Sequence, residues 1–154
     1  AVGWEGVDKR IDVIATALKA GLTVYDLEEV ELCYAPQFGA AKDPVNIAAM
    51  TAANALRDDA PVRFWNEPLD DVLLDVRDPD EFEAGHVPGA INIPLHQLRE
   101  RLQELPQTQS VSVYCLVGQR AYYATRLLRL NGVDARNMTG GYKTFLQFQE
   151  TCAE

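Results

Sequence analysis

Residues 61–154 alternate between two spacings of apolar positions, one typical of strands and one typical of helices. Short apolar runs that end at turn residues predict strands, and apolar residues three and four apart predict helices. The order of strands and helices predicts an α/β fold in which parallel strands are joined by right-handed crossovers. The predicted elements are strand 71–77, a turn and short helix 78–85, strand 91–94, helix 95–105, strand 110–115, helix 119–132, strand 134–138 and helix 140–150.

The apolar side chains of these elements also predict which faces are buried. Strand 71–77 carries a nearly continuous apolar run, which is typical of a strand covered on both faces. Helices 95–105 and 119–132 each carry an apolar stripe, and the second is expected to stop at Asn131 and Gly132. The stripe of the first helix consists of Leu95, Leu98, Leu102 and Leu105, and that of the second of Ala124, Leu127, Leu128 and Leu130.

The first 60 residues show helical spacing and little else. Helix 7–21 is expected to end at Gly21 in a left-handed conformation. Residues 25–36 predict a short helical turn capped by Asp26, followed by an extended piece. The apolar stripe of helix 7–21 consists of Ile11, Ile14, Ala15 and Leu18.

A second helix is predicted over residues 42–59. Asp43 is its expected N-cap, and Pro44 occupies the first helical position, where a missing N–H costs nothing. One side of this helix is smooth enough to let another backbone come close. That face consists of Val45, Ala49, Ala52 and Leu56.

Charged residues, alanine and proline cluster at 56–64, as expected of a linker. The sequence therefore predicts two regions, 1–60 and 61–154. Two helices bury too small a core for region 1–60 to fold independently. This region is expected to be the end of a larger domain, or a part that packs on a partner and forms a homodimer.

The net charge of the chain argues against two classes of partner. The chain has 14 basic and 23 acidic residues in 154, a net charge of -9, which argues against nucleic-acid binding and against an anionic membrane surface. No stretch approaches the roughly 20 apolar residues of a membrane helix. Three cysteines without metal-type spacing predict free thiols in a reducing cytoplasm and no metal site.

The segment CLVGQR, residues 115–120, leads from a predicted strand into a helix. Ligands of a parallel sheet bind beyond the carboxyl ends of its strands. Successive N–H groups in such a loop curl around an anion, and the helix N-terminus adds partial positive charge. Gly118 permits the tight turn, and Arg120 is expected to close the cradle with a permanent cation. These features favour the thiolate and make Cys115 a candidate nucleophile rather than an ordinary buried cysteine.

Two further residues, Asp75 and Arg77, are expected to pair at the end of a strand and to order the neighbourhood of the loop. The other titratable candidates are expected to have no catalytic part. His86 is interpreted as a hydrogen-bonded turn residue, and His96 as an exposed residue of helix 95–105. The two remaining cysteines, Cys33 and Cys152, are interpreted as inert.

Three segments, LLDVRDPDEFEAGHVPGAINIP, VYCLVGQR and TGGYKTF, resemble the rhodanese domain, a sulfurtransferase module. The motifs occur in the family's order and spacing, and the resemblance extends from Pro61 to about Gln149. It implies a parallel sheet of about five strands between helices, with Cys115 carrying sulfur as a persulfide. The loop that it implies for substrate binding consists of Leu116, Val117, Gly118, Gln119 and Arg120.

Loop length separates two relatives within this resemblance. Four residues lie between Cys115 and Arg120, as in the sulfurtransferases. The similar cysteine phosphatases have five, which surround a phosphate. Phosphatase or arsenate chemistry is therefore the weaker interpretation.

Residues 5–50 resemble the end of the dimerisation domain of flavin-dependent coenzyme A disulfide reductases and related NADH oxidases. One branch of those enzymes carries a rhodanese domain directly afterwards. The resemblance implies FAD, NAD(P)H and coenzyme A for a full-length reductase. None of these cofactors is expected in this chain, because it contains no GxGxxG fingerprint and no room for nucleotide-binding domains.

Two functions of different classes remain open. In the first, the Cys115 thiolate takes a sulfane sulfur from a donor such as polysulfide, a thiol persulfide or thiosulfate and passes it to a thiol acceptor. In the second, the chain is a non-catalytic interaction or regulatory module. Leu116 and Val117 make the loop apolar, and Arg120 is its only basic residue. This composition predicts a preference for polysulfide or a thiol persulfide over dianionic thiosulfate.

Overall fold

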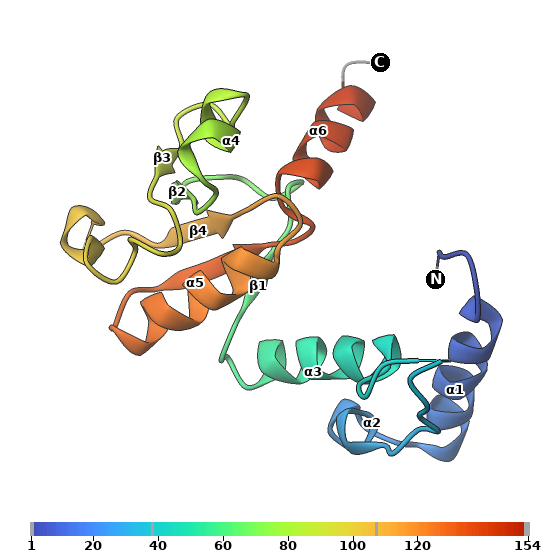
Figure 1. Cartoon of the computed structure of the whole chain (residues 1–154). Coiled ribbons are helices and arrows are strands. Elements are labelled where there is room, and N and C mark those ends of the chain that lie inside the picture. The colour runs from blue at the N-terminus through green and yellow to red at the C-terminus, as the bar shows by residue number, and fades with distance from the viewer. Residues whose placement is uncertain (1, 38, 107, 153–154) are drawn as a thin grey trace. The chain divides into compact units, whose positions relative to one another are not determined.

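The computed structural model describes residues 2–37, 39–106 and 108–152, and the chain divides into two compact units, 1–57 and 58–154. The first unit is helical, and the second contains a sheet flanked by helices (Figure 1). The helices of the first unit are α1 (Val7–Ala20), α2 (Val24–Glu29) and α3 (Pro44–Leu56).

Capping residues fix the ends of the three helices in the first unit. Gly21 ends α1 with φ 73°, and Asp43 caps α3, so both predictions are confirmed. The predicted cap of α2 is wrong by one turn, because the N-cap is Thr23. Asp26 is instead the third helical residue, and its carboxylate accepts hydrogen bonds from Thr23 in a capping box.

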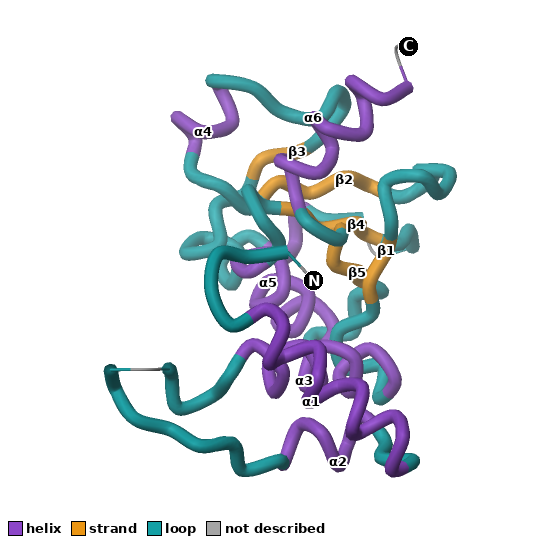
Figure 2. Tube along the Cα trace, turned by 90° about the vertical axis from the view of Figure 1, so that its right-hand side faces the viewer, coloured by secondary structure: helices purple, strands orange, loops and turns teal. Residues whose placement is uncertain are grey.

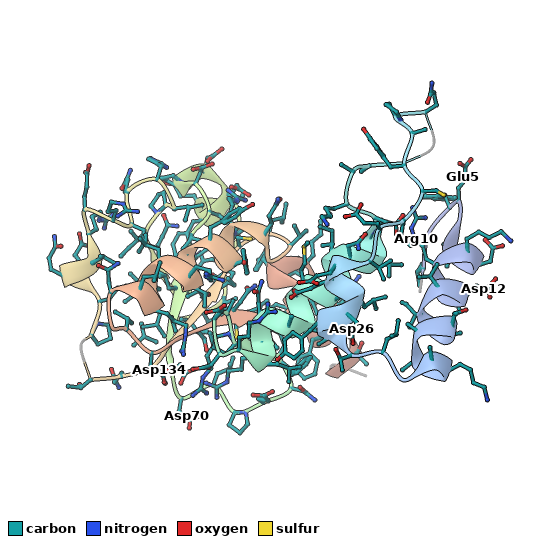
Figure 3. The ribbon with its side chains drawn as sticks, turned by 90° about the horizontal axis from the view of Figure 1, so that it is seen from below. Glu5, Arg10, Asp12, Asp26, Asp70 and Asp134 are labelled. Carbon is teal, nitrogen blue, oxygen red and sulfur yellow. The ribbon has the colours of Figure 1, made fainter. Side chains whose placement is uncertain are left out.

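The buried faces of α1 and α3 differ from the predicted stripes. Arg10, labelled in Figure 3, donates to Asp43 at 3.0 Å and thereby turns Ala17, seven residues on, into the core. The predicted stripe of α1 is consequently exposed, with Leu18 73% accessible. In α3, buried Asn46 donates to the carbonyl oxygen of Val30 at 2.9 Å. The buried residues of α3 are Val45, Asn46, Ala49 and Ala53, whereas Leu56 is exposed.

The second unit contains a five-stranded, wholly parallel sheet with strand order β1-β5-β4-β2-β3. Figure 2 shows the strands, in orange, side by side. The α/β fold predicted from the sequence is confirmed. The strands are β1 (Val62–Arg63), β2 (Val72–Asp75), β3 (Ile91–Asn92), β4 (Val111–Tyr114) and β5 (Ala135–Met138), and the helices are α4 (Pro79–Glu83), α5 (Gln119–Leu130) and α6 (Gly141–Cys152). The predicted linker 56–64 therefore includes β1, which pairs with β5.

The alternation of side chains along β4 separates two cores. Val111, Val113 and the following Cys115 lie in a cluster with α5, which packs on β4 and β5 (Figure 1). Tyr114 lies in the other cluster, with Trp65 and residues of α6 packed against it. The buried residues of α5 are Ala121, Ala124, Thr125 and Leu128. Leu130, which the stripe placed inward, is 80% exposed because it lies at the last position of the helix.

The predicted helix over residues 95–105 is wrong. This segment forms a series of turns and one short 3₁₀ helix, Leu102–Glu104. Several N–H groups of the segment, such as those of Arg101 and Glu104, bond to the carbonyl oxygen three residues earlier. The Leu95 N–H donates to the carbonyl oxygen of Val76 at 3.1 Å, which joins the start of the segment to the residue after β2. Leu98 and Leu105 are nevertheless buried in the core of the unit.

A buried carboxylate links the amino-terminal ends of two strands. Asp71 accepts hydrogen bonds from Ser110 and from Ser112, the latter at 2.6 Å, and forms an ion pair with Arg63. Burial raises the pKa of Asp71, but the hydrogen bonds from the two serines and from Arg63 outweigh it. The pKa of this carboxyl is therefore lowered from its ordinary value.

This lowered pKa predicts acid sensitivity. The stabilisation by Asp71 is complete above the unfolded-state pKa of about 4 and is lost as pH falls through the lower folded-state pKa. We expect Asp71→Asn to flatten the fall of the free energy of unfolding below about pH 4, measured by urea titration at several pH values. The control is Asp70→Asn, because Asp70 is exposed at the rim of the unit (Figure 3). Parallel pH curves for wild type and Asp71→Asn would contradict this assignment.

Candidate active site

Cys115 follows β4 directly and is 1% exposed. The loop after it turns at Gly118, which has φ 103° and precedes the first residue of α5. The N–H of Gly118 donates to Cys115 Sγ at 3.2 Å. The N–H groups of the first turn of α5 have no partner within the helix, so the sulfur lies at the positive end of the helix dipole. Of the predicted cradle, the structure therefore shows one N–H group that donates to the sulfur.

The amino-terminal end of α6 holds the other side of the loop. Tyr142 N–H donates to the carbonyl oxygen of Cys115 at 2.8 Å, and Lys143 N–H to that of Leu116 at 3.1 Å. Gly141 has φ 60°, and a Cβ atom there would lie 2.3 Å from the Cys115 carbonyl oxygen. The loop carbonyls therefore bind α6, which leaves the opposite, N–H side of the loop to the sulfur.

A side chain of β5 closes this arrangement. Asn137 Nδ2 donates to the Gly118 carbonyl oxygen at 3.2 Å.

The spacing of apolar residues did not identify Asn137, Gly141, Tyr142 or Lys143 as neighbours of the cysteine. The adjacent glycines in TGGYKTF were the available signal, because two consecutive positive-φ residues allow a close approach of backbones.

The remaining predicted loop residues form the surface around the sulfur. Leu116 is half-buried, Val117 is 54% exposed, and Gln119 is exposed at the start of α5. The rim of the loop is thus apolar and neutral at the two positions next to Cys115. This composition suits a ligand with an uncharged body.

Arg120 does not present a free charge to the loop. Its guanidinium donates to both carboxylate oxygens of Glu81, at 2.6 and 2.8 Å, and lies 3.5 Å from Asp78. The hydrogen bonds from Arg120 lower the pKa of Glu81, and Glu81 in turn raises the pKa of Arg120. The sequence analysis missed Glu81, although the Asp78–Glu81 spacing of a capping box marked the start of α4.

The predicted pairing of Asp75 and Arg77 is present and fully buried. Arg77 Nη2 lies 2.6 Å from an Asp75 oxygen. Burial lowers the pKa of Arg77, but the hydrogen bonds and the negative charge of Asp75 outweigh burial, so the pKa of Arg77 is raised. The guanidinium also lies over the ring of Tyr142, 4.3 Å from its centre. Since Tyr142 N–H binds the Cys115 carbonyl, the pair supports the loop through this ring rather than by direct contact.

The surroundings of the other candidate residues of the sequence are as follows. His86 Nδ1 lies 2.9 Å from the Phe82 carbonyl oxygen, and its ring stacks on Phe82, as a turn residue would. His96 is exposed, but in a turn rather than in the predicted helix. Cys33 is exposed in the first unit, and the side chain of Cys152 lies outside the described residues.

In the part of the chain that the structure describes, no group of three or more His, Cys, Asp or Glu residues is arranged to hold a metal ion. None of the helices described combines the length and apolar character needed to cross a membrane.

Two curated proteins illustrate the similarity of this chain to known proteins. Protein YqhL of Bacillus subtilis is 46% identical over 72 residues, which are 46% of this chain and 57% of that protein. The human thiosulfate:glutathione sulfurtransferase is 34% identical over 90 residues, which are 49% of this chain and 78% of that protein.

Two solved structures match more of the chain. The reduced CoADR-RHD of Bacillus anthracis is 44% identical with a TM-score of 0.84, and the NAD-dependent persulfide reductase of A. fulgidus is 37% identical with a TM-score of 0.77. Each match covers 90% of this chain, which spans 26% of the length of either structure. The predicted resemblance to coenzyme A disulfide reductases is thereby confirmed. The rhodanese-like domain family matches residues 54–147, more than half of the sequence, and the chain belongs to that family.

Proposed function

We propose that the chain transfers sulfane sulfur through a persulfide on Cys115. The observation that carries the proposal is the N–H of Gly118 on Cys115 Sγ at the amino-terminal end of α5, which favours a sulfur anion. The family and its sulfurtransferase members support this class of reaction.

The proposed reaction has two balanced steps. The Cys115 thiolate attacks the outer sulfur of a donor R–S–S⁻, a bond from Cys115 Sγ to that sulfur forms, the donor S–S bond breaks, and R–S⁻ leaves with the bonding electron pair. An acceptor thiolate then attacks the outer sulfur of the Cys115 persulfide and regenerates the Cys115 thiolate. The loop N–H groups stabilise the negative charge in both states without supplying a proton.

Intact mass spectrometry tests the proposal directly. The wild type, incubated with a thiol persulfide and freed of excess donor, is expected to gain one sulfur atom and to lose it when a thiol is added. Absence of the gain would contradict the proposal. The rate of iodoacetamide alkylation at several pH values then separates the enzyme from a non-catalytic module, because a Cys115 that reacts only where an ordinary free thiol does favours the module.

The rim of the loop predicts the preferred donor. An apolar rim and a paired Arg120 suit a thiol persulfide, including that of coenzyme A, better than dianionic thiosulfate. We expect Leu116→Arg to raise kcat/KM for thiosulfate about tenfold relative to a thiol persulfide, because it adds a cation beside the sulfur. Leu116→Gln is the control, since it removes the apolar side chain without adding charge. Equal use of both donors by the wild type would show that loop charge does not set the preference.

The wider context is also part of the proposal. We infer that the chain acts as the C-terminal part of a coenzyme A disulfide or persulfide reductase, supported by two structures of which it matches about a quarter. FAD and NAD(P)H belong to the rest of such an enzyme, because the residues of this sequence contain no dinucleotide fingerprint. The acceptor thiol would then be regenerated by the larger protein.

Association through residues 1–60 remains a prediction. The exposed stripe of Ile11, Ile14 and Leu18 on α1 is an apolar surface of the kind that covers itself by self-association. We expect light scattering to give a dimer mass for the chain and a monomer mass for Leu18→Lys, while Lys19→Glu, at an exposed neighbouring position, leaves the mass unchanged. A monomer mass for the wild type would contradict the prediction.

A further inference from the structure

Glu81 forms an ion pair with Arg120, the one basic residue of the cysteine loop, residues 115–120. Both of its carboxylate oxygens accept hydrogen bonds from Arg120, and both side chains are largely shielded, with 28% and 32% of their surfaces exposed. A bidentate carboxylate–guanidinium pair in such a place is among the stronger charged contacts of a protein. Asp78 adds a second carboxylate at 3.5 Å, so the guanidinium and its two carboxylates together carry one negative charge.

This arrangement discriminates between anions by charge. A dianion entering the loop would either displace Glu81 from Arg120 or lie close to two carboxylates, and both alternatives cost free energy. A persulfide with a single charge needs only the N–H groups at the start of α5. Lys143, which binds the loop through its backbone N–H, is present in every variant compared below.

We propose that Glu81 is a specificity-determining residue that excludes dianions from the Cys115 loop by keeping Arg120 paired. The consequence for sulfur donors rests on the sulfur-transfer function proposed above, whereas the exclusion of dianions does not. Glu81 acts through Arg120 and is a positioning residue rather than a catalytic one.

Glu81→Gln isolates the charge from the structural part of this residue. Glu81 also accepts a hydrogen bond from the Asp78 N–H at 3.2 Å in the capping box of α4, and glutamine keeps that acceptor. Asp80→Asn is the matched control, because Asp80 is an exposed acid on the same helix and makes none of the ion pairs recorded for Arg120. Asp78→Asn removes the more distant carboxylate and is expected to give a smaller shift in the same direction.

Protection against alkylation measures dianion binding without any sulfur transfer. Sulfate, at constant ionic strength, is added to each full-length variant, and the concentration that halves the rate of iodoacetamide reaction at Cys115 is determined. We expect this concentration to fall about tenfold in Glu81→Gln and to be unchanged in Asp80→Asn. In parallel, the ratio of kcat/KM for thiosulfate to that for the singly charged persulfide of 2-mercaptoethanol is expected to rise about tenfold in Glu81→Gln and to stay unchanged in Asp80→Asn.

The two arms separate failure of the inference from failure of the proposed function. If no donor places sulfur on the wild type, sulfur transfer is refuted and the sulfate arm still decides the exclusion of dianions. If sulfur transfer occurs but both the sulfate concentration and the donor ratio match between Glu81→Gln and wild type, the part assigned to Glu81 is overturned. An equal shift in Asp80→Asn would also overturn it, because it would show a general effect of surface charge.

Discussion

Cys115→Ser is expected to abolish sulfur loading, with no mass gain from any donor. A serine hydroxyl is not ionised at neutral pH and lacks the nucleophilicity of a thiolate, so the cradle of N–H groups would have no sulfur anion to stabilise. The free energy of unfolding should change little, because serine is close to cysteine in size and its hydroxyl can accept the Gly118 N–H. The measurement is intact mass after incubation with a thiol persulfide, together with a urea titration.

Cys33→Ser is the matched control for this experiment. Cys33 is an exposed cysteine of the first unit, and its replacement should leave the gain of one sulfur atom intact. A Cys115→Ser variant that still acquires sulfur, with loss of the gain in Cys33→Ser, would move the site to the first unit and refute the proposed function.

Gly141→Ala is expected to lower the rate of sulfur loading about a hundredfold, although residue 141 never touches a donor. A Cβ atom would lie 2.3 Å from the Cys115 carbonyl oxygen, so the loop or α6 must move. Displacement of a reacting group by about 1 Å commonly costs two orders of magnitude in rate. The positive φ of 60° adds backbone strain of about 1 kcal/mol. The rate constant for persulfide formation is measured at saturating donor.

Gly132→Ala separates strain from contact. Gly132 has φ 81°, yet a Cβ atom there would meet nothing within 4 Å. This variant should lose only about 1 kcal/mol of the free energy of unfolding and retain its rate of loading. Equal rates for Gly141→Ala and Gly132→Ala would show that the contact between α6 and the cysteine loop does not position the sulfur.

Local patterns were sufficient to predict most of the fold. The apolar run of β2, the caps of α3 and the strand that ends before Cys115 are each specified by residues adjacent in sequence. Segment 95–105 was assigned to an α-helix because spacing by three and by four gives similar apolar stripes over a few turns. The hydrogen bond from the Leu95 N–H to the carbonyl oxygen of Val76, just after β2, joins residues 19 positions apart and is not visible in the local pattern.

The site was predictable in its centre and not in its surroundings. The cysteine, the glycine turn and the arginine lie within six consecutive residues, so their proximity follows from the sequence. The pairing of Arg120 with Glu81 joins residues 39 positions apart. Charge alone could not specify this pairing, because Asp78, Asp80 and Glu81 are neighbouring acids and only the turn of α4 selects among them.

The dependence of the cysteine loop on α6 has a consequence for the order in which the site is assembled. During synthesis Cys115 leaves the ribosome well before Tyr142 and Lys143, whose N–H groups bind the carbonyl oxygens of Cys115 and Leu116. A nascent chain that has not reached Gly140 therefore holds the thiol without the contacts that orient its loop. If the proposed function holds, we expect Cys115 to accept sulfur only after α6 has docked on its loop.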